Sequence, residues 1–159
     1  MILTFRAGDF ALLSQTAEYA LRAIVCLAEN PKQPKTSQQI AERTKVPSGY
    51  LSKVLQSLGR SGLVRSQRGL HGGFVLADDP KKMTVLDVVS AVDPIRRIES
   101  CPLGLESHGK NLCPLHRKLD DAMAEIESAF GSATLSDLLN DPNRNTPLCE
   151  MPNKRTTKR

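Results

Sequence analysis

The feature that most constrains this chain is a helix-turn-helix pattern that runs directly into a glycine-tipped hairpin, between Thr36 and Leu76. Thr36 and Gln39 have the spacing of a capping box, which opens a short helix. The helix is expected to break at Thr44–Pro47, because the residue before a proline is pushed out of the α region. This order of elements predicts a winged-helix module, a class that binds nucleic acid.

A second helix is expected to begin at Ser48, with the Ser48 side chain as its N-terminal cap. Four apolar residues of this helix recur at i, i+3, i+4 and i+7 and so face a core: Leu51, Val54, Leu55 and Leu58. The opposite face carries hydrogen-bonding side chains that suit phosphates and base edges: Ser48, Tyr50, Ser52, Lys53, Gln56 and Arg60. A helix reads the major groove with its exposed N-terminal turns. Ser48, Tyr50, Ser52 and Lys53 are therefore the expected contacts of this helix with DNA.

The hairpin is expected to consist of strands at residues 63–67 and 73–77, with glycines at the tip between them. Without a Cβ atom, glycine lets the backbone approach phosphates closely, so that Arg68 can reach into the narrow minor groove. Arg65, Arg68 and His71 are the expected wing contacts with DNA. The alternative interpretation of the whole pattern is an amphipathic helical hairpin whose polar face only meets solvent.

The rest of the chain favours a mainly α fold, with helices expected at residues 14–28, 84–92, 114–131 and 134–139. Apolar residues of the 114–131 helix step 4-3-4-3, the seam spacing of a coiled coil: Leu115, Leu119, Ala122, Ile126 and Ala129. The predicted division is an N-terminal extension (1–13), a winged helix-turn-helix domain (14–93), a cysteine-containing sensor loop (94–113), a dimerisation helix with a short C-terminal helix (114–140) and a basic, disordered tail (141–159).

Composition narrows the class of function. A formal net charge of +5 suits a polyanionic partner, and an aromatic content of 4% without Trp disfavours base-stacking modes of RNA recognition. The chain shows neither a convincing signal peptide nor an apolar run long enough to span a membrane, so we expect a cytoplasmic protein with no membrane partner. No phosphate-binding glycine loop and no arrangement of nucleophile, base and acid is evident, so we do not expect an enzyme.

The chain resembles the Rrf-two family of bacterial winged-helix regulators over nearly all of residues 13–139. The residues that carry the resemblance are Leu13-Ser-Gln-Thr-Ala-Glu-Tyr-Ala-Leu21, Tyr50-Leu51, Gly62-Leu-Val64, Arg68-Gly69, Gly72-Gly73-Phe74 and Val89-Ser-Ala-Val-Asp93. The resemblance implies a homodimer on a partly palindromic duplex operator, with the 114–131 helix in the dimer interface. The minor-groove arginine of the family corresponds to Arg68.

A second chemical feature lies between Cys101 and His116. Cys113 and His116 stand about one helical turn apart at a helix start, where a single ion could meet both. In the cluster-binding members of the family this loop carries three evenly spaced cysteines, of which Cys101 and Cys113 match the outer two, and His116 matches a further ligand. Ser107 stands at the middle position, and serine is a poor iron ligand beside thiolate.

Four interpretations of this loop stay open. An iron–sulfur cluster, [2Fe–2S] in the favoured case, could use Cys101, Cys113 and His116, with Glu18 (the position of an acidic ligand in some relatives) or His108 as the fourth ligand. Zinc could bind Cys101, His108, Cys113 and His116. The two thiols could instead close into a disulfide on oxidation. The last alternative is a degenerate loop without a cofactor, in a regulator that senses a small molecule or a partner protein.

Two further cysteines are expected to play no part in sensing. Cys26 lies in an apolar helix and is expected in the core, and Cys149 lies in the polar tail. Together these observations predict a sequence-specific, homodimeric transcriptional repressor whose affinity for DNA depends on the state of the 101–116 loop. A winged-helix adaptor that binds proteins and not DNA is the alternative from another class.

Overall fold

The computed structural model of the chain describes residues 13–70, 72–105 and 111–142. Its elements are, in order, α1 (Gln15–Ala28), α2 (Ser37–Thr44), α3 (Ser48–Arg60), β1 (Val64–Gln67), β2 (Gly73–Leu76), α4 (Val85–Ser90), α5 (Pro114–Ser132) and α6 (Leu135–Leu139). The expected fold class, mainly α with a β-hairpin wing, is confirmed. Nearly all of the expected N-terminal extension and basic tail, including Cys149, lies outside the described residues.

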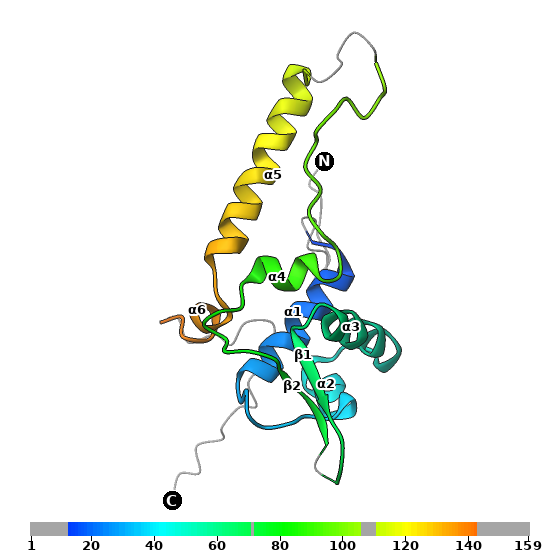
Figure 1. Cartoon of the computed structure of the whole chain (residues 1–159), viewed down its shortest axis with the longest axis vertical. Coiled ribbons are helices and arrows are strands. Elements are labelled where there is room, and N and C mark those ends of the chain that lie inside the picture. Colours follow the sequence, from blue (N-terminus) through cyan, green and yellow to red (C-terminus); the bar gives the residue numbers. More distant parts are fainter. Residues whose placement is uncertain (1–12, 71, 106–110, 143–159) are drawn as a thin grey trace, which may run out of the picture.

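Helix α1 is the centre of the globular part of the molecule (Figure 1). Ser14 caps it, because its hydroxyl accepts a hydrogen bond from the Ala17 N–H at 3.2 Å. Most of the helix is buried, as expected of a helix that is apolar nearly all round, and it packs against α2, α3, α4 and α6. Cys26 is fully buried there, which confirms that it is a core residue.

Capping boxes begin three of the helices, as the threonines at these positions indicate. Thr36, Thr84 and Thr134 each accept a hydrogen bond from the third backbone N–H of their helix, and the side chain at that position bonds back to the threonine N–H. Lys45 ends α2 in the left-handed conformation, with φ 58°, and so turns the chain toward α3.

The expectation that Ser48 caps α3 is wrong. Pro47 is the capping residue, and no side chain there makes a capping hydrogen bond. The physical reason is that Pro47 already holds the extended conformation before the helix, and its carbonyl accepts hydrogen bonds from the N–H groups of Tyr50 and Leu51, both at 3.0 Å. Ser48 is therefore the first helical residue, and its hydroxyl is not required by the helix end.

The wing is an antiparallel hairpin whose register runs from Val64 opposite Leu76 to Gln67 opposite Gly73. It is fastened to the start of α2 by a third segment: the Phe74 N–H donates to the Lys35 carbonyl at 2.8 Å, and the Lys35 N–H donates to the Phe74 carbonyl at 3.0 Å. Gly73 permits this contact, because a Cβ atom there would lie 2.5 Å from the Lys35 carbonyl oxygen. The wing and the helix-turn-helix thus form one connected unit.

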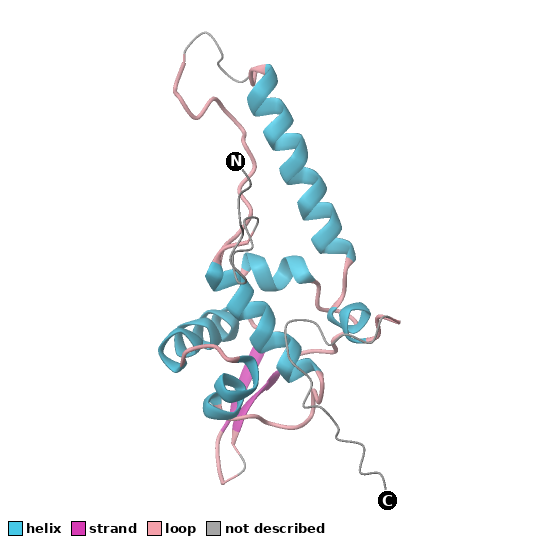
Figure 2. Cartoon of the chain, turned by 180° about the vertical axis from the view of Figure 1, so that it is seen from behind, coloured by secondary structure: helices cyan, strands magenta, loops and turns pink. Residues whose placement is uncertain are grey.

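Helix α5 projects away from this unit, on the side opposite the wing tip (Figure 1). Its C-terminal end is held by backbone hydrogen bonds, from the Val85 N–H to the Ala133 carbonyl and from the Leu135 N–H to the Met83 carbonyl, each 2.9 Å long. The chain after α4 runs beside α5 toward its N-terminal end in both views (Figures 1 and 2). None of the 19 residues of α5 is buried in the single chain.

Candidate nucleic-acid interface and cysteine loop

Helix α3 presents a polar face to solvent, as the sequence predicts. Its four apolar residues pack into the core, and the expected contacts Ser48, Tyr50, Ser52 and Lys53 are all exposed. The Ser52 hydroxyl donates to the Ser48 carbonyl at 3.0 Å, so its oxygen stays available as an acceptor. Hydroxyl, phenol and ammonium groups stand together on one open helix face, the arrangement that contact with phosphates and base edges requires.

Tyr50 is 57% exposed but held on one side by Tyr19 from α1. The two rings meet edge to face, with their centroids 6.0 Å apart and their planes at 62°. Such a contact favours a defined ring orientation. Tyr19 is thus a residue of the candidate interface that sequence reasoning missed, because the pair joins two helices far apart in the chain.

The wing brings two cations to the same end of the molecule. Arg65 on β1 and Arg68 just after it are both exposed, and Gly69 beyond them has φ 114°, a conformation that favours glycine. His71, the third expected wing contact, lies outside the described residues. Leu70 at the tip is 97% exposed, and sequence reasoning missed it, although an apolar residue between glycines is a visible signal.

The helix-turn-helix is braced from behind by charged side chains. Arg22 on α1 binds the Glu18 carboxylate and donates to the Thr44 carbonyl at the end of α2, at 3.3 Å. A second arginine, Arg43 on α2, pairs with Glu29 at 2.9 Å. These contacts fix α2, and hence the turn into α3, relative to α1.

The described residues of the cysteine loop, 101–105 and 111–116, lie at the other end of the molecule, near the N-terminal end of α5 (Figure 1). Cys113 is the N-cap residue of α5, and its Sγ atom lies 3.4 Å from the Nδ1 atom of His116. Cys101 is buried, and its carbonyl accepts a hydrogen bond from the Gly104 N–H at 3.0 Å. Ser107 and His108 lie outside the described residues. The predicted pairing of Cys113 with His116 is therefore present in the geometry.

The described donors do not complete a metal site. Within residues 13–70, 72–105 and 111–142, no three Cys, His, Asp or Glu side chains gather closely enough to hold a metal ion. Glu18, the candidate acidic ligand, is 4% exposed in α1 and engaged by Arg22. The described side chains thus supply two positions of a four-ligand cluster or zinc site, Cys113 and His116, and do not bring further donors to that pair.

An arginine–carboxylate pair joins the chain after α4 to α5. Arg97 donates to both carboxylate oxygens of Asp120, at 2.7 and 2.6 Å, and its third nitrogen lies 3.5 Å from Glu127. The Arg97 guanidinium, with the Ile98 N–H, lowers the pKa of Asp120 to about 2. The hydrogen bond with Asp120 in turn raises the pKa of Arg97. Asp120 is therefore ionised at physiological pH.

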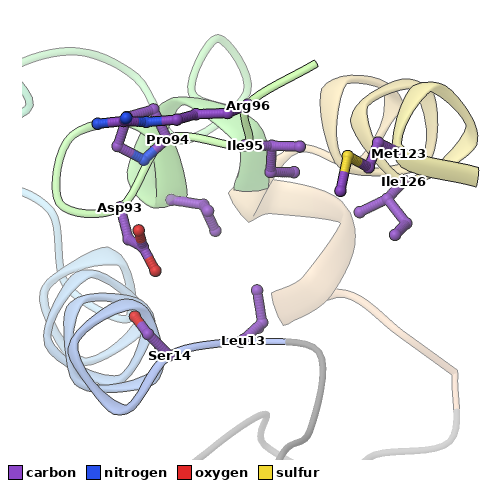
Figure 3. Close-up of a pocket in the computed structure, with 9 residues that line it drawn as sticks. Leu13, Ser14, Asp93, Pro94, Ile95, Arg96, Met123 and Ile126 are labelled. Carbon is purple, nitrogen blue, oxygen red and sulfur yellow. The ribbon is translucent and has the colours of Figure 1, made fainter. Parts of the chain in front are cut away.

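A small cavity of about 230 Å³ separates the base of this chain segment from α5 (Figure 3). The Asp93 carboxylate and the Ser14 hydroxyl lie on one side of the cavity, and Met123 and Ile126 of α5 lie on the other. Its size exceeds that of the roughly 150 Å³ cavity that accommodates benzene in an engineered protein. The cavity combines an apolar wall with the Asp93 carboxylate, and Arg96 also lines it.

The model of the Rrf2 family, described as iron-dependent transcriptional regulators, matches residues 13–141. The chain belongs to the Rrf2 family. An HTH-type transcriptional regulator of Aquifex aeolicus is 33% identical over 132 residues, which cover 81% of this chain and 92% of that protein. The HTH-type transcriptional regulator IscR of Xenorhabdus nematophila is 30% identical over 128 residues, covering 80% of this chain and 78% of IscR.

Solved structures agree with the Rrf2 fold. CymR, the global cysteine regulator of B. subtilis, superposes with a TM-score of 0.66 at 29% identity, covering 79% of this chain and 94% of CymR. IscR of T. potens superposes with a TM-score of 0.68 at 27% identity, covering 81% of this chain and 86% of that IscR. The family membership confirms the expectation of a transcriptional regulator and not an enzyme. No helix in the described ranges is both long and apolar enough to cross a membrane.

Proposed function

We propose that this Rrf2 protein is a homodimeric repressor that places α3 in the major groove of a duplex operator and the wing in the adjacent minor groove. The observation that carries the proposal is the exposed polar face of α3 together with the exposed Arg65 and Arg68 of the wing; α3 and the wing lie at the end of the molecule opposite the N-terminal end of α5 (Figure 1). Ser48, Tyr50, Ser52 and Lys53 meet base edges and phosphates, and Arg68 enters the minor groove.

A second copy of the chain is the proposed occupant of the open face of α5. Leu115 and Leu119 are 66% and 45% exposed, and they begin the 4-3-4-3 seam that continues through Ala122, Ile126 and Ala129. Burying such a seam between two antiparallel or parallel copies removes apolar surface from water. It also pairs two recognition helices, as a palindromic operator requires.

The DNA proposal is tested with Arg68→Ala, using an operator obtained by selection from random duplexes and fluorescence anisotropy at several salt concentrations. We expect weaker binding and a shallower salt dependence, because the variant neutralises one phosphate fewer or leaves the minor groove empty. Arg117→Ala removes the same charge from the exposed surface of α5 and serves as the control. Binding that does not weaken with salt in the unmodified protein would favour the adaptor function.

The signal is proposed to enter at the 101–116 loop. Two thiolates and an imidazole suit an iron–sulfur cluster, with [2Fe–2S] favoured and Glu18 or His108 as the remaining ligand; the cluster would supply redox chemistry there. Among the described residues, only Cys113 and His116 lie together as candidate ligands. Zinc and a dithiol–disulfide switch are therefore the alternatives to a cluster. The protein purified without oxygen distinguishes them: iron with acid-labile sulfide indicates a cluster, zinc alone a zinc site, and neither a thiol switch.

A second candidate signal is a small molecule in the cavity beside Asp93 (Figure 3). One carboxylate on an apolar wall suits a compact ammonium compound, for which 2-phenylethylamine is a probe. Binding of the probe that shifts the NMR signals of Leu13 and Ile95, and that Asp93→Asn abolishes, would support this signal. Equal binding of 2-phenylethanol would exclude the carboxylate from recognition.

A further inference from the structure

Arg97 connects the cysteine loop to the middle of α5. Its Nε and one Nη atom donate to the two oxygens of the Asp120 carboxylate, at 2.7 and 2.6 Å. The Ile98 N–H donates to the same carboxylate at 2.8 Å. Three hydrogen bonds thus converge on one side chain of α5. They come from two successive residues of the loop arm, which is the chain segment between α4 and Cys101.

This arrangement fixes position more firmly than a single-point ion pair. A guanidinium that grips both carboxylate oxygens has one geometry, whereas an exposed lysine pair has many. The backbone bond from Ile98 adds a restraint that does not depend on a flexible side chain. Arg97 and Asp120 are partly exposed, so we expect the pair to contribute little to the stability of the fold and much to the register of the arm on α5.

That register sets the level of Cys101 relative to Cys113. Cys101 lies four positions after Arg97, and an extended chain advances at most roughly 13 Å over that distance. Cys113 lies seven positions before Asp120, which is roughly 10 Å along the helix axis. Both segments run from the Arg97–Asp120 pair toward the N-terminal end of α5 (Figures 1 and 2). The reach of the two segments therefore lets Cys101 stand within about one helical turn of the height of Cys113.

We propose that Arg97 and Asp120 are positioning residues, which hold Cys101 at the level of Cys113 and transmit a change at these thiols to α5. The proposal rests on the proposed role of the 101–116 loop as the sensor. The base of α5 is held independently by the backbone bonds at Ala133 and Leu135. Movement of the loop arm would thus act on the middle of α5, while the C-terminal end of α5 stays fixed.

The test is the rate at which Cys101 and Cys113 close into a disulfide in a Cys149→Ser background. Diamide is the oxidant: the two thiols lose two protons and two electrons, the S–S bond forms, and the azo group becomes a hydrazine. Thiol blocking followed by peptide mass analysis counts the intramolecular product. Arg97→Gln should slow closure about tenfold or more, because misplaced reacting groups lose rate steeply.

Matched controls separate positioning from charge. Arg96→Gln and Asp121→Asn make the same charge changes one residue away on exposed side chains and should leave the rate within about twofold of the parent. Asp120→Asn keeps an acceptor for the Ile98 N–H, whereas Asp120→Ala keeps none. The expected order of rates is therefore parent, then Asp120→Asn, then Asp120→Ala.

Two results would overturn the proposal: an unchanged rate in both Arg97→Gln and Asp120→Ala, or a parent protein that forms only intermolecular disulfides. A parallel urea titration must show the variants equally folded, and a rate that merely tracks lost stability also counts against positioning. Salt-dependent DNA binding by the reduced parent tests the proposed function separately. If that binding fails while Arg97→Gln still slows closure, the positioning role stands and the regulatory role falls.

Discussion

Replacing Gly73 by alanine should detach the wing from the start of α2. The added Cβ would lie 2.5 Å from the Lys35 carbonyl oxygen, 2.6 Å from the Lys35 carbonyl carbon and 3.0 Å from the Thr36 nitrogen. Carbon–oxygen contacts in proteins are normally no closer than about 3.3 Å, so the shortfall is about 0.8 Å. Every obstructing atom belongs to the backbone, so β2 must move away from Lys35.

That movement sets the magnitude. A shift of about 0.8 Å stretches both hydrogen bonds between Phe74 and Lys35, now 2.8 and 3.0 Å, beyond hydrogen-bonding distance. Each bond contributes a net of about 1 kcal/mol, so the free energy of unfolding should fall by about 2 kcal/mol. The φ angle of Gly73, 159°, is one that residues with a side chain rarely adopt, so backbone strain adds to the steric cost.

Gly59→Ala is the matched control with the opposite sign. Gly59 lies in α3, and the nearest atom to an added Cβ is a methyl carbon of Val64, 4.0 Å away. Alanine in a helix is more stable than glycine by about 0.5–1 kcal/mol, so this variant should be stabilised.

Urea denaturation followed by circular dichroism, at one protein concentration, measures both variants, and fluorescence anisotropy measures their affinity for DNA. Gly73→Ala should also bind DNA more weakly under conditions where it is fully folded, since the wing loses its attachment. If Gly73→Ala unfolds at the parent's urea concentration and binds DNA as the parent does, the bridge between Lys35 and Phe74 is not what places the wing.

Three further predictions follow from contacts described above. Leu119→Glu should turn the proposed dimer into a monomer, measured by light scattering, because it places a charge in the seam. Ser128→Glu on the opposite face of α5 should not, and a dimer that survives Leu119→Glu would exclude this interface. Tyr19→Ala should weaken DNA binding about threefold to tenfold, the equivalent of the 0.5–1.5 kcal/mol of an aromatic pair, whereas Tyr19→Phe should bind as the parent; equal binding by all three would show that Tyr50 needs no support. The Asp120 carboxyl should titrate by NMR with a pKa of about 2, moving toward 3.8 in Arg97→Gln. Because the folded-state pKa is depressed, the contribution of the pair to stability is fully present above about pH 4 and is lost as the pH falls through about 2; a midpoint near 4 in the parent would refute the pairing.

Local signals in the sequence predicted most of the helix boundaries. Thr36 with Gln39 and Thr84 with Asp87 act within one helical turn, so the residues that decide the helix start are adjacent in the chain. The same local logic failed at Ser48, because Pro47 already supplied the extended capping conformation and the two signals overlap by one residue. Where one signal stood alone, its prediction was correct.

The contacts that assemble the candidate sites are long-range, and no local sequence pattern predicts them. Arg97 and Asp120 are 23 residues apart, and the sequence around either residue is typical of an ordinary surface charge. Glu18 is a contrasting case: Arg22 follows it at the spacing of a helical ion pair, and its candidacy as a metal ligand came from the family position. The pairing with Arg22 was readable from the sequence and gives Glu18 a structural task in this chain.

The attachment of α5 has a consequence for how such regulators can diversify. The foot of the helix is tied to the DNA-binding unit by hydrogen bonds between Val85 and Ala133 and between Met83 and Leu135, which use backbone atoms only. Backbone bonds are indifferent to side-chain identity, and they lie beyond the C-terminal end of α5, away from residues 99–113. Residues can therefore be inserted, deleted or exchanged in that loop without removing the bonds that attach α5 to the DNA-binding unit. A chain built this way can acquire a new stimulus while the attachment of α5 is inherited unchanged.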